Sequence, residues 1–167
     1  MPQGFQQDRT AETTDPRIRR SRNMLMEALA KLLTQKNFDD ISIQEIAAEA
    51  TLNRATFYLH YPGKDALLQA MTDVRFRHLM ERRGISFTDC DGALRAIALG
   101  VCDYLAETTS CPGQLARVPH EGSIIPVVEG MFMEGLAHHE IAPGADAALL
   151  ATTAAWAVFG AKLLKIW

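Results

Sequence analysis

The chain has 167 residues, of which 48% are hydrophobic and 22% are charged, and its net charge is −3. This composition is typical of a globular protein that folds alone or as an oligomer. The longest uncharged segment covers 15 residues, from Ala147 to Ala161. A membrane helix needs about 20 mostly apolar residues, so none is expected.

The N-terminal half predicts a small bundle of helices. Residues 1–14 are polar and aperiodic, which indicates a disordered arm; they lack the apolar core of a secretory signal, so we expect a cytoplasmic protein. Asp and Pro at 15–16 start a helix that continues to about residue 36. The sequence SIQE at 42–45 is a capping box that starts a short second helix. Asn53 can cap a third helix, which the PG pair at 62–63 ends.

The remaining residues predict a larger helical body. A long helix spans about 64–83, and Asp91 can cap the next one. Residues 109–122 hold two prolines and two glycines, which indicates a loop or a short broken helix. Apolar stripes follow over residues 124–136 and 145–167. Because no segment shows sustained strand alternation, the predicted fold class is all-α.

Charge is distributed unevenly between the two halves of the chain. Residues 1–83 carry 13 Lys and Arg against 11 Asp and Glu, whereas residues 84–167 carry 4 against 9. The first half also holds four arginines between positions 17 and 22: Arg17, Arg19, Arg20 and Arg22. A solvated helix face explains this run as well as a phosphate-binding surface does. The split nevertheless makes the N-terminal half the candidate for binding a polyanion.

The second and third predicted helices form a helix-turn-helix. In such a motif the second helix enters the major groove of DNA, and an apolar inner face locks it to the first. Ile46, Leu52 and Phe57 supply that inner face. Tyr58 then points about 100° away from Phe57 around the helix, toward solvent or groove. Arg54, at the start of the helix, can reach guanine or phosphate.

Residues 18–71 resemble the N-terminal domain of the tetracycline-repressor (TetR/AcrR) family of bacterial transcriptional regulators. The capping box, the helix IAAEA at 46–50 and the stretch NRATFYLHYPGKDAL at 53–67 stand in register with that family. The resemblance implies a three-helix DNA-binding head over residues 15–62 and an all-α ligand-binding and dimerisation body over residues 63–167. By matching position, it implies these DNA-contacting residues: Ser42, Gln44, Asn53, Arg54, Ala55, Thr56, Tyr58, His60 and Lys64.

Three features depart from the family pattern. Thr51 stands where the family often has glycine, and Gly63 stands where it often has a serine or asparagine cap. These two positions leave open the angle of the turn and the anchoring of the next helix. The family usually ends in two long helices that pair across the dimer, whereas this sequence stops as one of them finishes. Either the final helix is absent or the chain is incomplete.

No segment indicates enzyme chemistry, a cofactor or a metal. The chain lacks G-x-S-x-G, P-loop, G-x-G-x-x-G and H-E-x-x-H motifs. His120 and the HHE run at 138–140 do not predict a metal site, because adjacent helical histidines point about 100° apart. Three cysteines without a C-x-x-C pair, Cys90, Cys102 and Cys111, favour reduced thiols over a redox sensor.

We therefore predict a homodimeric transcriptional repressor that leaves a roughly palindromic DNA operator when a small apolar effector occupies the body. Methionine and aromatic side chains suit an adaptable apolar pocket, although they also suit a plain core. The side chains expected to hold the effector are Phe76, Met80, Cys102, Leu105, Met131, Phe132, Trp156 and Phe159. The Ala- and Gly-rich outer face of the last helix is the predicted dimer contact.

Two alternatives stay open from the sequence. The chain could be an effector-independent regulator or an activator, or it could be a helical module whose head binds a protein. Ionic strength separates DNA binding from protein binding, because phosphate contacts weaken steeply with salt and apolar protein contacts do not.

Overall fold

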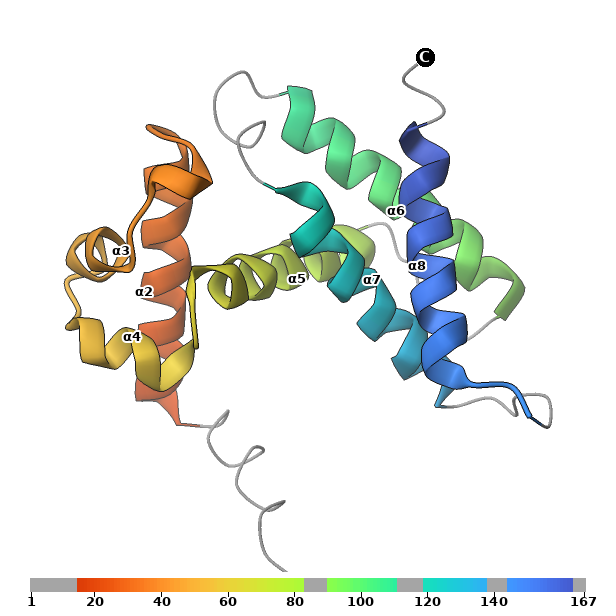
Figure 1. The fold of residues 1–167 in the computed structure, drawn as a ribbon, viewed down its shortest axis with the longest axis horizontal. Helices are drawn as coiled ribbons and strands as arrows, with labels where there is room; N and C mark the ends of the chain where they lie inside the picture. Colours follow the sequence, from red (N-terminus) through yellow and green to blue (C-terminus); the bar gives the residue numbers. More distant parts are fainter. Residues whose placement is uncertain (1–14, 83–89, 111–118, 138–143, 164–167) are drawn as a thin grey trace, which may run out of the picture. The chain divides into compact units, whose positions relative to one another are not determined.

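The computed structural model describes residues 15–82, 90–110, 119–137 and 144–163, and within these ranges every regular element is helical. The predicted all-α fold is confirmed. In chain order the elements are α2 (Pro16–Leu33), the 3-10 helix η1 (Phe38–Asp40), α3 (Ile43–Glu49), α4 (Arg54–His60), α5 (Lys64–Arg82), α6 (Cys90–Ser110), α7 (His120–Leu136) and α8 (Ala147–Leu163) (Figure 1). The predicted arm, residues 1–14, lies outside the described residues.

The chain forms two compact units, which we call the head (to Leu67) and the body (from Leu68). The division falls inside α5, whereas the sequence placed it just before this helix. None of the described helices is long and apolar enough to cross a membrane.

In the head, α2 is defined by local signals at both ends. The Asp15 carboxylate accepts a hydrogen bond from the backbone N–H of Arg17 at 2.8 Å, and Pro16 occupies the first turn. The helix ends at Leu33, earlier than predicted, because the first two backbone hydrogen bonds that follow it span three residues in place of four. The N–H groups of residues 34, 35 and 36 turn back to the carbonyls of Lys31 and Leu32.

The head core lies where α2, α3 and α4 pack against one another (Figure 1). Helix α2 contributes an apolar stripe, and α4 contributes one large anchor, Phe57, with no exposed surface. Other fully buried side chains come from the connections and from α3: Phe38, Ile41 and Ile46. Burying these apolar groups stabilises the head and fixes the rotation of each helix about its axis.

The turn between α3 and α4 is a Schellman motif with an unusual central residue. The N–H of Thr51 donates to the carbonyl of Ala48 at 3.0 Å, and the N–H of Leu52 donates to that of Ala47 at 2.9 Å. Thr51 has φ 55°, in the left-handed region that favours glycine. The family glycine that Thr51 replaces is therefore explained by the backbone of the turn.

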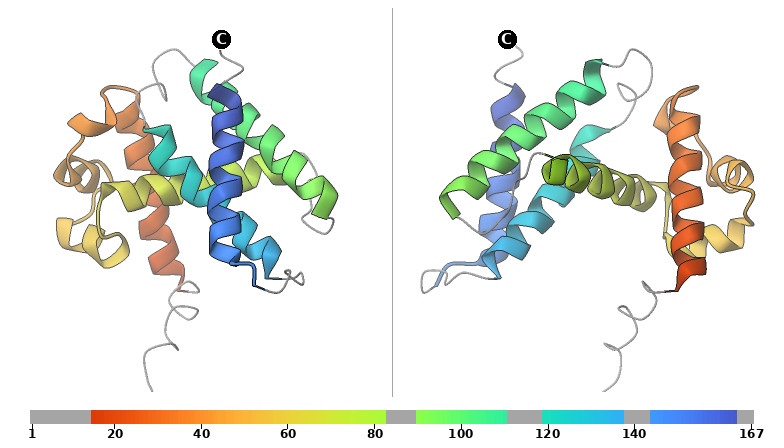
Figure 2. Two further views of the ribbon diagram at one scale, coloured as in Figure 1. Left: turned by 45° about the vertical axis from the view of Figure 1, so that its right-hand side comes forward. Right: turned by 180° about the vertical axis from the view of Figure 1, so that it is seen from behind.

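In the body, α5, α6, α7 and α8 surround one hydrophobic cluster. Its buried members include Phe76, Met80, Ile97, Ile124 and Val128. Helices α7 and α8 run side by side in both views of Figure 2. Polar contacts also link the helices. The Arg77 guanidinium of α5 forms an ion pair with Glu134 of α7 at 2.8 Å, and the Thr152 hydroxyl of α8 donates a hydrogen bond to Glu129 of α7 at 2.6 Å.

Two predictions about the body helices are corrected. Helix α6 begins at Cys90, so Asp91 lies in its first turn and not at the cap. The predicted loop or short broken helix at 109–122 has narrower bounds, because α6 extends to Ser110 and α7 begins at His120, and residues 111–118 lie outside the described residues.

Thr51→Gly should stabilise the protein. A non-glycine residue in the left-handed region is disfavoured by roughly 1–2 kcal/mol, so glycine relieves strain in the folded state. Part of this stabilisation is lost because glycine also has more conformational freedom in the unfolded chain. We expect the free energy of unfolding, measured with urea, to rise by about 0.5–1 kcal/mol. Thr51→Ala removes the hydroxyl without admitting φ 55° and should give no such gain. A loss of stability in Thr51→Gly would contradict the strain at this turn.

Candidate nucleic-acid interface

Helix α4 presents two different faces. Its start is held by Asn53, whose side chain accepts a hydrogen bond from the N–H of Ala55 at 2.9 Å. Phe57 is fully buried, whereas the next two side chains are exposed: Tyr58 by 47% and Leu59 by 81%. The predicted division between an inner Phe57 and an outer Tyr58 is confirmed. Leu59, the most exposed large hydrophobic side chain among the described residues, was not among the predicted contacts.

Arg54 and Tyr58 form one unit on the outer side of α4. The Arg54 guanidinium lies 5.6 Å from the centre of the Tyr58 ring and donates to the phenol oxygen at 3.3 Å. The Tyr58 ring also packs edge to face with Phe57, with ring centres 5.6 Å apart. Because the phenol oxygen accepts from Arg54, its own O–H can donate to a phosphate or base. The pair is therefore ordered before any ligand binds.

At the start of α3, the predicted capping box is confirmed. Glu45 N–H donates to Ser42 Oγ at 3.2 Å, and the Ser42 N–H and hydroxyl both donate to Glu45 Oε2, at 2.9 and 2.8 Å. Lys36 also binds this carboxylate, and these bonds together lower the pKa of Glu45 to about 2. A phosphate contact by Ser42 would have to break one of these bonds. Gln44 is exposed beside them.

Lys64 is placed differently from the prediction. Its ammonium group donates to three backbone carbonyls, those of Phe38, Asp39 and Ile41, at 2.9, 3.0 and 3.1 Å. It also lies 4.7 Å from the centre of the Phe38 ring. An ammonium group has three hydrogens, and all three are used. Lys64 thus ties the start of α5 to the segment between α2 and α3, and the predicted phosphate contact would have to break one of these bonds.

The basic run at the start of α2 lies on the head. Arg17, Arg19 and Arg20 are exposed, in agreement with either explanation offered above. Arg22 is different, because its guanidinium lies 5.4 Å from the centre of the buried Tyr61 ring. Burial raises the pKa of the Tyr61 phenol, and Arg22 opposes that rise. One arginine of the four therefore supports the core, and three face solvent.

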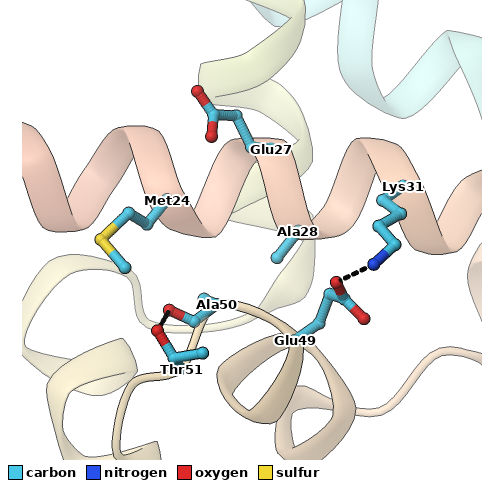
Figure 3. Close-up of a pocket in the computed structure, with 7 residues that line it drawn as sticks. All are labelled: Met24, Glu27, Ala28, Lys31, Glu49, Ala50 and Thr51. Carbon is cyan, nitrogen blue, oxygen red and sulfur yellow. Dashed lines mark hydrogen bonds and ion pairs between the residues drawn. The ribbon is translucent and has the colours of Figure 1, made fainter.

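A shallow depression of about 230 Å³ lies between α2 and the turn after α3 (Figure 3). Ala28 and Ala50 are its small buried members, and the Lys31–Glu49 ion pair lies at one side. The only cation lining the depression is thus already paired, and Glu27 adds a negative charge. The depression therefore does not suit a phosphate group.

The residues predicted to hold an effector divide into three groups. Most belong to the hydrophobic cluster of the body, either buried in it or, for Phe132, packed against it: Phe76, Met80, Leu105, Met131, Phe132 and Phe159. Cys102 is half-buried. Trp156 is a correction, because its side chain is 54% exposed on α8 and does not face the interior of the body.

The sequence analysis did not identify two polar side chains within the body. The Thr72 hydroxyl is buried and has no hydrogen-bond partner of good geometry among the described residues. The Tyr104 phenol is also buried, which raises its pKa, while an interaction with Thr72 opposes that rise. The Tyr104 ring packs edge to face on Phe76, with centres 5.9 Å apart. Nothing in the local sequence pattern marks either residue, because both sit on apolar stripes.

No group of three or more metal-ligating side chains occurs within the ranges described above. The HHE run at 138–140, as well as Cys111, lies outside those ranges, and the side chains of His120 and Cys90 are not described.

Residues 25–71 match the family described as bacterial regulatory proteins, tetR family. The head is a TetR-family DNA-binding domain. The regulator YuxN of Bacillus subtilis is 35% identical to this chain over 54 residues, which cover 32% of this chain and 19% of YuxN. EthR of Mycolicibacterium smegmatis is 32% identical over 71 residues, which cover 38% of this chain and 33% of EthR. Both are named as transcriptional regulators with a helix-turn-helix. The chain thus spans about a third or less of these relatives.

Among solved structures, NalD is the secondary repressor of the MexAB-OprM multidrug efflux pump in Pseudomonas aeruginosa. It is 16% identical to this chain, with a TM-score of 0.44, over 85% of this chain and 83% of NalD.

Phe57→Ala and Tyr58→Ala should affect different properties. Emptying the Phe57 site should lower the free energy of unfolding by roughly 3–5 kcal/mol. Removing the exposed Tyr58 ring should leave the thermal midpoint nearly unchanged and weaken DNA binding. Thermal denaturation and a DNA-binding titration on the same preparations test both. Equal losses of stability would contradict the two faces assigned to α4.

Lys64→Met should act on stability and not on the salt dependence of DNA binding. Loss of the ammonium group leaves the partly buried carbonyls of Phe38 and Ile41 without this donor, which costs roughly 1–3 kcal/mol. The slope of log affinity against log salt should match that of the unsubstituted protein. Arg54→Gln is the matched comparison, because removing one phosphate contact flattens this slope by about 0.9. A flattened slope with an unchanged thermal midpoint in Lys64→Met would contradict this structural role and support the predicted phosphate contact.

Proposed function

We propose that this protein is a homodimeric transcriptional repressor that binds a palindromic DNA operator through α4 and releases it when a small effector enters the body. The observation that carries the proposal is the outer face of α4. There Arg54 packs on the Tyr58 ring, and that ring packs on the buried Phe57. The helix directly follows a Schellman turn. This arrangement supports a rigid helix that meets the major groove without large rearrangement.

The charges of the head support the same proposal. Arg17, Arg19 and Arg20 provide exposed positive charge on α2, and Arg54 adds another at the N-terminus of α4. Guanidinium groups bind phosphate oxygens through charge-assisted hydrogen bonds. The proposed DNA contacts are therefore Gln44, Asn53, Arg54, Ala55, Thr56, Tyr58 and His60, with a contact from Ser42 conditional on a rearranged capping box. Lys64 is left out because its donors are used. A DNA-binding role places the protein in the cytoplasm.

Helix α8 supports a dimer. Leu149, Leu150 and Trp156 expose 66%, 44% and 54% of their side chains, Thr153 is exposed between Leu150 and Trp156, and Ala157 is exposed after Trp156. Leu149, Thr153 and Trp156 are spaced by four and three residues, so they form one stripe along the helix. Large apolar side chains gathered on one surface are typical of protein interfaces. Trp156 thus moves in our proposal from the effector site to the dimer contact.

The interior of the body supports an effector that is apolar with one polar group. Its apolar cluster, with Cys102 at the edge, suits the apolar part of a ligand. The buried Thr72 hydroxyl, which has no partner of good geometry among the described residues, could bind the polar part, since a buried polar group without a hydrogen bond is unfavourable. A ligand that binds only one conformation of the body must, by linkage, alter the affinity for DNA.

DNA binding should fall steeply as salt rises. With the full chain and duplexes selected from a random library, log affinity should decrease linearly with log salt, by about 0.9 for each phosphate contact. Random duplexes of equal length are the control, and apolar compounds added to the complex test release. Binding that neither prefers a sequence nor depends on salt would favour the protein-binding alternative. Specific binding that no compound disturbs would favour an effector-independent regulator.

Trp156→Arg should convert the dimer to a monomer. A charged side chain buried in an apolar interface is strongly unfavourable, so sedimentation should give the monomer mass. Affinity for a palindromic operator should fall, whereas affinity for a half-site should not. Leu99→Arg is the matched control, because Leu99 is similarly exposed, at 50%, but lies on α6. A dimer that survives Trp156→Arg would contradict the assignment to α8.

A further inference from the structure

Leu59 occupies the outermost position of α4. Successive helical residues are rotated by about 100°, so Leu59 and Ala55, two residues after and two residues before the fully buried Phe57, each lie about 160° from it on opposite sides. Both side chains are exposed, and Leu59 exposes 81% of its surface. The centre of the outward face is therefore apolar. Arg54 and Tyr58 stand on one flank of it.

This placement is unusual for a helix end that meets DNA. A leucine side chain neither donates nor accepts a hydrogen bond, so it gains nothing from a phosphate or from the polar edges of bases. The major groove does display one apolar group, the C5-methyl of thymine. Against a G·C pair, the same leucine would remove water from polar edges without replacing the lost hydrogen bonds.

We propose that Leu59 determines part of the operator sequence by packing on the C5-methyl group of a thymine in the major groove. Ala55, one helical turn or about 6 Å earlier, is small enough to let the backbone of α4 approach the bases closely. Each half-site then requires an A·T pair at one defined position. The inference rests on the proposed function, because it needs α4 in the major groove.

The order of the neighbouring side chains supports this role. Tyr58 is held between Phe57 and Arg54, which keeps its ring on the flank of α4 and off the outermost line. Leu59 is thus not covered by its aromatic neighbour. A single exposed leucine is ordinary on a protein surface. Here its position opposite the buried anchor, in line with Ala55, gives it a definite target.

Replacing thymine by uracil tests the contact directly. Uracil lacks the methyl group and keeps the hydrogen-bonding pattern of thymine. Operators are first selected from random duplexes with the full chain, and each thymine is then replaced singly. One replacement in each half-site should weaken binding by about fourfold, as expected for one buried methyl group. The other replacements should have little effect.

Leu59→Ala supplies the second arm of the experiment. This variant should bind the thymine operator more weakly, and its preference for thymine over uracil at the critical position should disappear. Its thermal midpoint should not change, since the side chain is exposed. Tyr58→Phe is the comparison: it should weaken binding to both operators alike and keep the thymine preference.

The outcomes separate the inference from the proposed function. If a sequence is selected but no uracil replacement matters, or if Leu59→Ala keeps the thymine preference, the methyl contact is wrong and the DNA-binding function stands. If no sequence is enriched and binding does not depend on salt, the proposed function fails, and the inference fails with it. Salt-independent binding to a protein through Leu59 would be such a case.

Discussion

The burial of Phe57 is the constraint on which the proposed DNA-binding surface depends. Helix α4 has seven residues and is too short to be stable by itself, so its rotation is set by the one large side chain that it inserts into the head core. Once Phe57 points inward, helical geometry places Tyr58 on one flank and Leu59 at the outermost line. The Tyr58 ring then rests on Phe57, and Arg54 rests on Tyr58. A single apolar contact thus orders a polar surface and an apolar one.

The connections around α4 hold that rotation in place. Before α4, the Schellman turn is held by backbone hydrogen bonds to the carbonyls of Ala47 and Ala48. It requires Thr51 to adopt an unfavourable left-handed conformation. After α4, the Lys64 ammonium binds three carbonyls near η1. Since Lys64 begins α5 and lies in the head, this lysine ties the first turn of α5 to the segment around η1. The strained turn at Thr51 and the hydrogen bonds of Lys64 thus both help to fix the position of α4.

The body combines an apolar interior with an apolar outer stripe. Inside, the cluster is close-packed where α6 meets α5, because a Cβ on Gly100 would lie 2.5 Å from the Met80 sulfur. The buried Thr72 and Tyr104 hydroxyls interrupt this apolar interior. Outside, Leu149 and Trp156 leave large apolar surfaces on α8. In the proposed function the buried Thr72 hydroxyl would meet the effector, and the outer stripe would meet a second copy of the chain.

Much of this protein follows from short-range signals in its sequence. The caps at Asp15, Ser42 and Asn53 act on N–H groups two or three residues away, and helical periodicity relates neighbours three or four residues apart. Such interactions are complete within one segment, so the all-α class, the helix-turn-helix and the opposite faces of Phe57 and Tyr58 could be predicted. Helix ends were harder to predict: α2 ends earlier than its apolar pattern, at Leu33, and α6 begins at Cys90 and extends to Ser110.

Only the tertiary structure decided where the remaining side chains act. The carbonyls that bind Lys64 belong to residues 23 to 26 positions earlier, so the sequence around Lys64 carries no sign of them. The outward direction of Trp156 and the buried hydroxyl of Thr72 likewise depend on which helices pack on either side. A local pattern states which residues share a face. Which face is buried, and which donors are already used, is determined by contacts between segments that are distant in the sequence.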